Sequence, residues 1–416
     1  MRPIRLTAVL THPVQYYSPW FRHVAAYAPE IDLTVLYGTE PTAEQQGTGF
    51  GRAFRWDVPL LEGYRSRVIR AARPDDRTDS SSFFGLDVRE IGNAIRETSP
   101  DVVLVPGWHS ITLVRAMFAA RRMNVPLLFR GDTNLASAPE GVRGRLWRLR
   151  TKHLLALFDA YLTPGRRVRE YLEALGVNPG QIVDAPHVVD NERFAAAARP
   201  FQSADGRARA RAKWQLPADA TVLLFAGKLE EKKRPLDLIR AAARLDPRAH
   251  VLVAGAGELE SNCRAEAGRL GVPVAFAGFL NQSEIGEAYA AADLLVLPSD
   301  SRETWGLVVN EALATGLPVV VSDRVGCAPD LVDDSTGATF VCGDLESLAA
   351  TIEQVRSRAA TGGYAAGCRR RSRQFDVGAA TAGLVAACRR VAGVGVDEEW
   401  SASTIKHVGA PGEVAK

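Results

Sequence analysis

Residues 293–323 read DLLVLPSDSRETWGLVVNEALATGLPVVVSD and place a helix-like segment between two short apolar runs. The two runs, 293–299 and 317–323, are almost continuously apolar, which is typical of strands buried on both faces of a parallel sheet. The segment between them, 306–316, is expected to be a helix. This strand–helix–strand order predicts an α/β fold and puts the loop before the helix at the carboxyl end of a strand.

The same alternation runs through the rest of the chain. In the C-terminal half, further strands are expected at residues 221–227, 249–255 and 274–279, and further helices at residues 234–245, 259–271 and 281–292. In the N-terminal half, strands are expected at 4–10, 31–37, 102–106, 126–130 and 160–164, with helices at 18–28, 87–99, 111–123 and 145–158. The sequence therefore predicts two doubly wound, Rossmann-like domains that face each other across a cleft.

We expect four segments along the chain. They are an N-terminal domain (1–195), a C-terminal domain (196–375), a helix that crosses back to the N-terminal domain (376–396) and a disordered tail (397–416). The tail is expected to be disordered because it shows no apolar periodicity.

Charge and cysteine content exclude several classes of protein. The net charge of +3 is too small to indicate nucleic-acid binding by itself. The five cysteines form no C-x-x-C pair and no zinc-ligand spacing, so we expect reduced thiols in a cytoplasmic protein without a bound metal.

No apolar run approaches the roughly 18 residues of a membrane-spanning helix. The N-terminal apolar run breaks at His12 and reads as a buried strand rather than a signal peptide.

The first candidate site is the loop that opens the expected helix. The free amides of Gly306 and Leu307 would carry partial positive charge and suit a phosphate or a sugar hydroxyl. If Glu303 and Glu311 were both helical, they would lie roughly 12 Å apart, wider than the about 5–9.5 Å between glycosidase carboxylates. We therefore expect them to contact different parts of one long ligand. The alternative is an ordinary loop glutamate and an ordinary surface glutamate.

The second candidate site is the basic loop after the strand at 221–227, which holds Lys228, Lys233 and Arg234. Positive charge at the carboxyl end of a strand suits a diphosphate, whose charge-assisted hydrogen bonds contribute about 1.5–3 kcal/mol each. The alternative is a solvated run of charges. The Gly-x-Gly at 255–257 lacks the third glycine of a dinucleotide-binding loop and is a weak signal by itself.

Three features follow one another along the chain: the basic loop, the Gly-x-Gly turn and residues 293–323. Together they resemble the donor-binding half of retaining GT-B glycosyltransferases of the family 4 type. The resemblance is strongest over residues 215–340, where Glu303 and Glu311 match the Glu-x7-Glu motif of that family. The N-terminal half is similar to the acceptor-binding domain of the same family through weaker motifs, among them residues 185–194, which keep Asp190.

The resemblance implies a role for each residue of the donor site. Lys228 and Lys233 would bind the diphosphate, Glu303 would contact the transferred sugar, and these three would form the catalytic set. Glu311 would hold the ribose hydroxyls. The backbone amides expected to face the sugar and the phosphate are those of Thr304, Trp305, Gly306 and Leu307. Because the chain has no D-x-D triplet, we expect no metal ion and no cofactor besides the nucleotide sugar.

Three loops of the N-terminal half are expected to line the acceptor side of the cleft. The residues expected to bind the acceptor are His12, Gln15, Tyr16, Trp108 and Arg130. We expect His109 or Asp132 to contact the donor sugar as a further catalytic residue. The alternatives are packing of the tyrosines and a hydrogen-bonded loop histidine. Residues 141–158 interleave arginines with leucines and a tryptophan, which would suit an anionic membrane surface or a solvated helix face.

The resemblance implies a retaining, metal-independent hexosyltransferase or related enzyme. It would move a sugar from a nucleoside-diphosphate donor to a glycan or lipid-linked saccharide, in surface polysaccharide or glycoconjugate biosynthesis, and would have no nucleic-acid partner. We expect it in the cytoplasm or on the inner face of the cell membrane. Two alternatives stay open: a sugar-nucleotide epimerase of the same architecture, and a non-catalytic sugar-nucleotide-binding protein.

Overall fold

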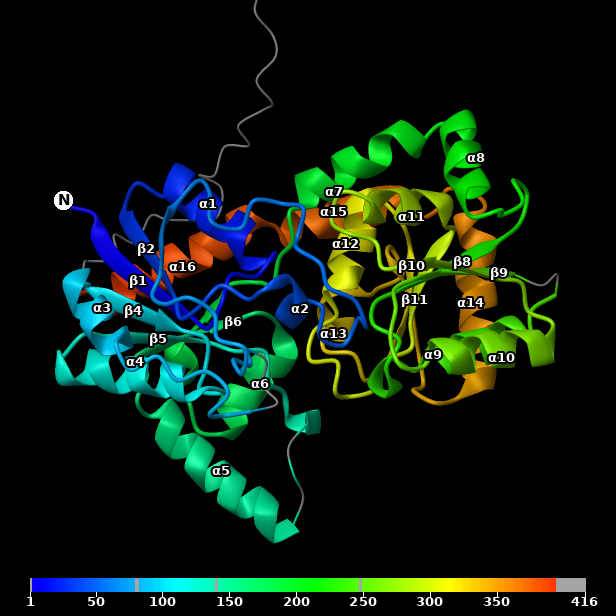
Figure 1. Ribbon diagram of the computed structural model, residues 1–416. Coiled ribbons are helices and arrows are strands. Elements are labelled where there is room, and N and C mark those ends of the chain that lie inside the picture. The colour runs from blue at the N-terminus through cyan, green and yellow to red at the C-terminus, as the bar shows by residue number, and fades with distance from the viewer. Residues whose placement is uncertain (1, 79–81, 138, 140, 247–248, 394–416) are drawn as a thin grey trace, which may run out of the picture.

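The computed structural model describes residues 2–78, 82–137, 139, 141–246 and 249–393. These residues form two parallel sheets, one in each half of the chain, with helices packed against both (Figure 1). The structure confirms the predicted α/β fold of two doubly wound units. The predicted tail, 397–416, lies outside the described residues.

The N-terminal sheet has seven strands in the order β3-β2-β1-β4-β5-β6-β7. The strands are β1 (Ile4–Leu10), β2 (Ile31–Tyr37), β3 (Arg65–Val68), β4 (Val102–Val105), β5 (Leu127–Arg130), β6 (Ala160–Thr163) and β7 (Ile182–Asp184). The helices are α1 (Tyr17–Tyr27), α2 (Ala43–Gln46), α3 (Ile91–Glu97), α4 (Ile111–Arg122), α5 (Gly141–Leu155) and α6 (Arg166–Ala174). The order reverses between β1 and β4, and ligands of such sheets bind at this point, outside the carboxyl ends of the strands.

The C-terminal sheet has six strands in the order β10-β9-β8-β11-β12-β13. The strands are β8 (Val222–Ala226), β9 (His250–Ala254), β10 (Val274–Gly278), β11 (Leu294–Leu297), β12 (Val319–Ser322) and β13 (Gly337–Phe340). The helices are α8 (Ala204–Lys213), α9 (Pro235–Ala242), α10 (Glu260–Leu270), α11 (Ile285–Ala291), α12 (Leu307–Thr315), α13 (Ala328–Leu331), α14 (Leu345–Ala359) and α15 (Ala365–Gln374). Strands β8, β11 and β12 are buried at every position, as their continuous apolar runs predict.

The sequence prediction missed the edge strands β3, β7 and β13. β3 reads RSRV, and its residues alternate between exposed and half-buried positions, so it has no continuous apolar run. β13 begins at Gly337, where an added Cβ would lie 1.8 Å from the carbonyl oxygen of Val319 on β12. These strands form because a neighbouring strand offers hydrogen-bond partners, and their own residues carry little strand signal.

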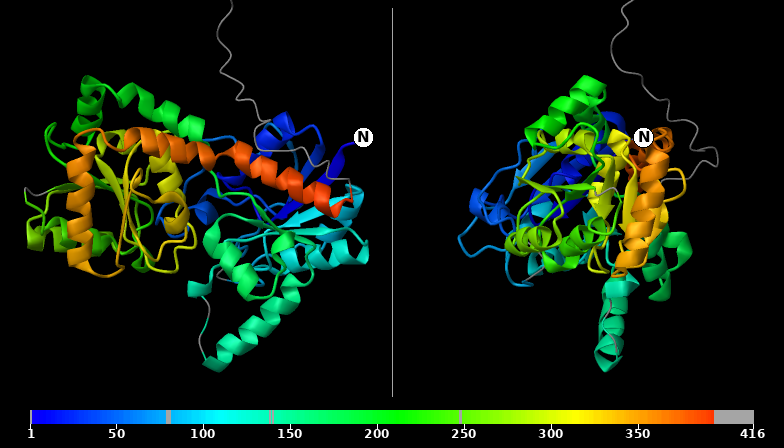
Figure 2. Two further views of the ribbon diagram at one scale, coloured as in Figure 1. Left: turned by 180° about the vertical axis from the view of Figure 1, so that it is seen from behind. Right: turned by 90° about the vertical axis from the view of Figure 1, so that its right-hand side faces the viewer.

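Two helices connect the halves. α7 (Asn191–Ala198) leads from the N-terminal sheet and packs against α11 and α12, whereas α16 (Val377–Val391) returns from the end of the C-terminal half. α16 packs against α1, β6 and β7, and Figure 2 shows it running back along the N-terminal half. Its buried side chains complete the core beneath α1; they are Ala380, Leu384, Val385, Ala387 and Cys388.

No helix in the described ranges is long and apolar enough to cross a membrane. Within the same residues, no group of three or more His, Cys, Asp or Glu side chains is placed to hold a metal ion.

Candidate active site

A cavity of about 350 Å³ opens between the two halves. On the C-terminal side it is lined by the loops that follow β8 and β11, and by the first turns of α12. On the N-terminal side it is lined by residues that follow β1, β5 and β7. The carboxyl ends of both sheets therefore meet at one site, as the topology requires for a ligand held between two doubly wound domains.

The amino terminus of α12 forms one wall of this cavity. Gly306 precedes the helix with φ 98°, a left-handed conformation that glycine adopts without strain. A Cβ at this position would lie 2.9 Å from Leu297 Cδ2 and 3.0 Å from Val325 Cγ1, so the packing also requires glycine. The free amides of the first turn are thereby held at the cavity wall, where their partial positive charge suits an anion.

Lys233 and Glu303 face each other on the same wall. Lys233 Nζ forms an ion pair with Glu303 Oε2, and each side chain keeps 13% of its surface exposed. The two side chains come from neighbouring loops, because Lys233 follows β8 and Glu303 follows β11, which is paired with β8 in the sheet. A largely buried ammonium beside free helix amides is chemically suited to a phosphate, and the paired carboxylate is suited to sugar hydroxyls.

Glu311 lies about one turn after Leu307, the first residue of α12. One side of Glu311 is open to the cavity and the rest is enclosed by protein. Tyr289 on α11 donates a hydrogen bond of 2.6 Å from its hydroxyl to Glu311 Oε2. Burial raises the pKa of Glu311 to about 7, although Tyr289, Arg193 and Lys233 each act to lower it. Glu311 therefore changes charge near neutral pH.

Comparison with known proteins agrees with this geometry. Residues 206–363 match the model of the family described as "Glycosyl transferases group 1", and residues 32–193 match the model of "Glycosyltransferase Family 4". The two matches fall on the two halves that meet at the cavity.

The chain belongs to the GT-B glycosyltransferases of the family 4 type.

Relatives in this family cover only part of the chain. A D-inositol 3-phosphate glycosyltransferase of Kineococcus radiotolerans is 35% identical over 184 residues, which are 41% of this chain and 40% of the relative. The matches span between 32% and 51% of the length of such curated relatives.

Solved GT-B structures are similar over nearly the whole chain. HepE of Anabaena, crystallised with UDP, is 17% identical with a TM-score of 0.70, and the match covers 92% of this chain and 98% of HepE. Sucrose-phosphate synthase of Thermosynechococcus elongatus is also 17% identical with a TM-score of 0.70, over 94% of this chain and 100% of the synthase. At this identity, the likeness shows that the fold is shared.

All of the residues that were expected to bind the nucleotide-sugar donor line the cavity. They are Lys228, Lys233, Glu303, Thr304, Trp305, Gly306, Leu307 and Glu311. Lys228 Nζ donates to the carbonyl oxygen of Thr48, 3.1 Å away in the N-terminal half. Arg234, which follows the second lysine, pairs instead with Asp237 at 2.7 Å and does not line the cavity.

The residues expected from the N-terminal half, five for the acceptor and His109 or Asp132 for the donor sugar, divide into two groups. Gln15, Tyr16 and Asp132 line the cavity, and Asp132 accepts a hydrogen bond of 2.7 Å from the hydroxyl of Thr304 on the opposite side. His12, Trp108, His109 and Arg130 do not line it.

Two of these four side chains are clearly used for packing. Trp108 packs against Phe129, with ring centroids 5.6 Å apart, at the edge of the N-terminal core. Arg130 is buried, donates to the carbonyl oxygens of Ala185 and Pro186 at 2.7 and 2.9 Å, and lies 4.4 Å from the ring centroid of Trp20. The positions of Trp108 and Arg130 do not support the predicted contact with an acceptor.

Several residues at the cavity or directly behind its lining were not foreseen from the sequence. Tyr289 holds Glu311, and Arg193 donates to the carbonyl oxygen of Gln282 at 2.6 Å beneath the same end of the cavity. Asn310 accepts from Trp305 Nε1 at 2.9 Å and donates to the carbonyl oxygen of His187 at 3.1 Å. Asn310 follows Trp305 by five positions on the same helix end, which is the one local signal that the sequence offers for these contacts.

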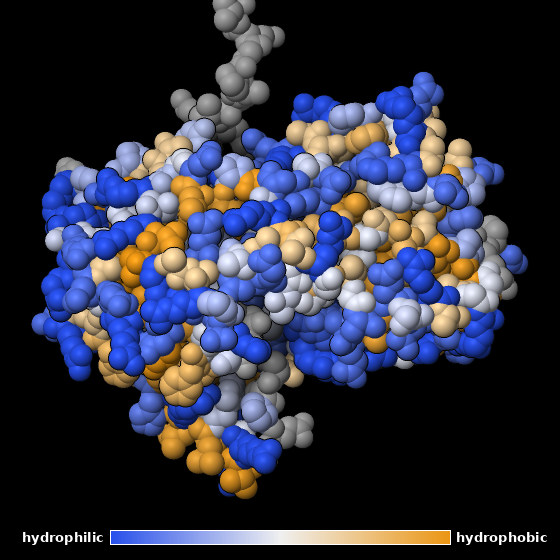
Figure 3. Space-filling model, in the orientation of Figure 1, coloured by the Kyte–Doolittle hydropathy of each residue, from blue (hydrophilic) through white to orange (hydrophobic). Residues whose placement is uncertain are grey.

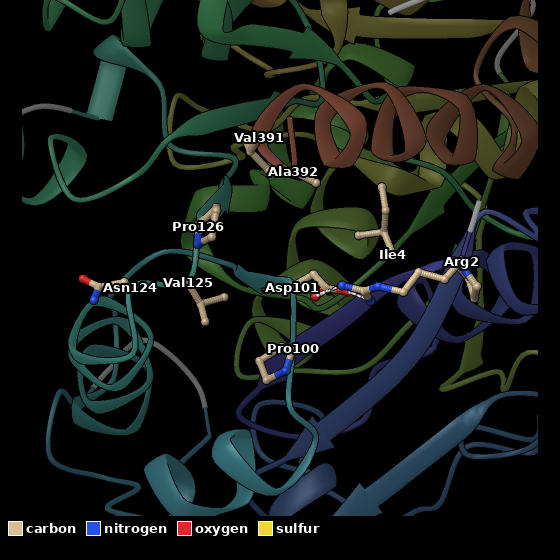
Figure 4. A pocket seen from close by; sticks show the side chains of 10 residues that line it. Arg2, Ile4, Pro100, Asp101, Asn124, Val125, Pro126, Val391 and Ala392 are labelled. Atoms are coloured by element: carbon tan, nitrogen blue, oxygen red, sulfur yellow. Dashed lines mark hydrogen bonds and ion pairs between the residues drawn. The ribbon is translucent and has the colours of Figure 1, made fainter. Parts of the chain in front are cut away.

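A second cavity of about 380 Å³ lies elsewhere, at the amino ends of β1 and β4 (Figure 4). There Asp101 accepts hydrogen bonds from Arg2 and Arg5, at 2.6 and 2.9 Å. These guanidinium groups hold the pKa of Asp101 well below its ordinary value. The carboxylate is saturated by the protein itself, so these contacts clamp together the amino ends of two central strands, opposite the end that holds the first cavity.

Proposed function

We propose that the chain is a retaining, metal-independent glycosyltransferase that uses a nucleoside-diphosphate sugar. One observation carries the proposal: Lys228, Lys233, the amide end of α12, Glu303 and Glu311 all line a single cavity between the domains. Family membership supports it. In this role the lysines and the helix amides bind the diphosphate, Glu303 contacts the sugar, and Glu311 accepts hydrogen bonds from the ribose.

The proposed reaction exchanges one bond at the anomeric carbon for another on the same face. The bond from that carbon to the β-phosphate oxygen breaks, and the electron pair leaves with the nucleoside diphosphate. An acceptor hydroxyl oxygen bonds to the same carbon, and its proton passes to the departing phosphate oxygen. Negative charge therefore grows on the phosphate, where Lys228, Lys233 and the α12 amides are preorganised to stabilise it.

The acceptor side of the cavity favours a neutral saccharide. Its lining residues after β1 and β5 are Gln15, Tyr16 and Asp132, none of which carries a positive charge, and Arg193, which also lines the cavity, donates to the carbonyl oxygen of Gln282 at the other end. A phosphorylated polyol would need cations there. We therefore propose a glycan or lipid-linked saccharide as acceptor, in surface polysaccharide or glycoconjugate synthesis; D-inositol 3-phosphate, named in the relatives, is the first competitor to test.

A cytoplasmic, peripheral membrane location is part of the same proposal. On α5 three apolar side chains share one exposed stripe, with exposed fractions of 66% for Val142, 64% for Leu146 and 56% for Leu149. Arginines flank the stripe, and Figure 3 shows apolar beside polar atoms at the lower end of the molecule, where Figure 1 places α5. α5 as a whole is weakly amphipathic, so the proposed contact with an anionic bilayer rests on these exposed apolar side chains and the arginines beside them.

Sedimentation with vesicles tests this location. The protein is expected to co-sediment with phosphatidylglycerol vesicles and not with phosphatidylcholine vesicles, and Leu146→Asp/Leu149→Asp is expected to abolish the binding. Equal recovery with both lipids, or an unaffected double variant, would contradict the membrane contact.

Donor turnover tests the enzyme itself. UDP-, GDP- and ADP-sugars are screened by thermal shift, where a donor at 100 times its dissociation constant should stabilise by about 2.7 kcal/mol. The donor that binds is then incubated with saccharide acceptors in the presence of EDTA. We expect transfer with the donor's anomeric configuration, read by NMR. Rearrangement of the sugar without an acceptor would indicate an epimerase, and binding without turnover would indicate a non-catalytic protein.

A further inference from the structure

A segment of the N-terminal domain, residues 47–57, reaches across to the C-terminal domain. We call it the strap. It follows α2, which is tied to the N-terminal half because Gln45 Nε2 donates to the carbonyl oxygen of Arg73 at 2.7 Å, and in Figure 1 the blue chain beyond α2 extends to the C-terminal elements. Glycines allow its tight path: a Cβ on Gly49, which has φ 84°, would lie 2.8 Å from Lys228 Nζ.

The far end of the strap is pinned to the loop between β10 and α11. Asn281 Nδ2 donates to the carbonyl oxygen of Arg55 at 2.7 Å, and the amide of Ser283 donates to Asp57 Oδ2 at 3.1 Å. The hydroxyl of Ser283 also bonds to Asp57. The residues of each pair are 226 positions apart in the chain. The path of the strap is therefore set by tertiary contacts.

Aromatic side chains fill the space beneath the strap. The ring centroids of Phe50 and Phe54 lie 4.9 and 4.2 Å from that of Phe279, and Trp56 lies 6.3 Å from it. Phe50 also has Lys228 Nζ 4.9 Å from its ring centroid. Of the strap residues, Phe50 lines the cavity between the domains.

Phe50 contacts both Lys228, at the proposed diphosphate site, and Phe279, in the loop that also holds Gln282. If the diphosphate lies at Lys228 and α12 and the ribose at Glu311, the base extends toward Gln282, which lines the cavity next to the pinned loop. The strap covers this end. Every base has a flat π face and can stack on an aromatic side chain.

We propose that Phe50 is a nucleotide-binding residue, contributed by the N-terminal domain, on which the base of the donor stacks. The inference rests on the proposed function, because it assumes a nucleoside diphosphate in the cavity. It adds a contact between the N-terminal domain and the donor. The strap and the C-terminal domain would then bind the nucleoside together.

Calorimetric titration of nucleotides and of inorganic pyrophosphate tests the proposal. Wild type, Phe50→Ala and Phe50→Tyr are titrated with UDP, GDP, ADP and pyrophosphate. We expect Phe50→Ala to weaken binding of the preferred nucleotide by about 5- to 150-fold, the range of one base–aromatic stack. Pyrophosphate, which has no base, should bind with nearly unchanged affinity, and Phe50→Tyr should restore nucleotide binding. Phe84→Ala is the control, because Phe84 is 75% exposed and does not line the cavity.

The outcomes separate this inference from the proposed function. If wild type binds no nucleoside diphosphate, the proposed function fails and the inference fails with it. If wild type binds one and Phe50→Ala binds it equally or more tightly, only the role of Phe50 is overturned. Equal weakening of nucleotide and pyrophosphate also overturns it, since Phe50 would then merely support Lys228. Should Phe50→Ala not fold, Phe50→Leu removes the aromatic face and keeps the bulk.

Discussion

Glu311 shows how its surroundings set the charge of one side chain in the cavity. Its pKa is about 7 in the folded protein against an ordinary value of 4.5, because burial penalises the charged form. Between these two pH values the folded protein holds more protons than the unfolded chain. The contribution of Glu311 to the free energy of unfolding is therefore greatest below pH 4.5 and is lost as the pH rises through 7.

Replacement of Glu311 by glutamine tests this charge effect. Glu311→Gln removes the buried charge and can still accept from Tyr289, so we expect the variant to be more stable than wild type at pH 8, by about 3 kcal/mol at most. The difference should shrink toward pH 5, where wild type is also neutral. Urea unfolding across this range measures it, and a gap that does not change with pH would show that Glu311 does not titrate there.

Lys233 is the second residue whose role follows from its position. Lys233→Ala removes a cation from the proposed diphosphate site and leaves Glu303 without its ion-pair partner. We expect kcat/KM for transfer to fall by about 100- to 1000-fold, as when one preorganised donor to a developing anion is removed. Lys213→Ala is a matched control, because Lys213 pairs with Glu287 on the surface between α8 and α11. Transfer within tenfold of wild type would remove Lys233 from the mechanism.

At the scale of the element, the start of α12 depends on Gly306. Gly306→Ala forces a non-glycine residue to φ 98° and places a Cβ against Leu297 and Val325. We expect a loss of about 1–3 kcal/mol in the free energy of unfolding and a displaced amide end, with weaker donor binding. Thermal unfolding and donor titration measure the two effects.

Gly268→Ala is the control for this prediction. Gly268 lies within α10, and an added Cβ would meet no atom within 4 Å, so alanine should stabilise the helix by about 0.5–1 kcal/mol. Equal stability of both variants would mean that Gly306 is not constrained by its conformation.

At the scale of the whole molecule, the N-terminal domain depends on the far end of the described chain. A protein ending at residue 375 lacks α16, whose apolar side chains fill the core beneath α1. We expect the N-terminal half of this truncated protein to lose fixed packing, seen as lost near-UV circular dichroism and as binding of a hydrophobic dye. A protein ending at residue 393 keeps α16 and should fold. A native near-UV spectrum without α16 would show that the return helix is dispensable.

Local sequence determined the central strands, many of the helices between them and the donor loops. Buried parallel strands are recognised as continuous apolar runs. A basic loop, or a glycine before a helix, favours anion binding through its own charge or backbone amides, so both can be recognised in the local sequence. For this reason Lys228, Lys233 and Gly306 could be placed at the cavity from the sequence, whereas Glu311 was placed there through the resemblance to the family.

Only the tertiary structure decided which residues of the N-terminal half face that cavity. Arg130 and Asp132 are two positions apart, yet Arg130 lies beneath the 185–186 backbone while Asp132 meets Thr304, 172 residues away in the chain. Phe50 reaches the site because its strap is pinned to Asn281 and Ser283. Such contacts join segments that are remote in sequence, so no local pattern of charge or hydrophobicity encodes them, and the packing of the two domains selects them.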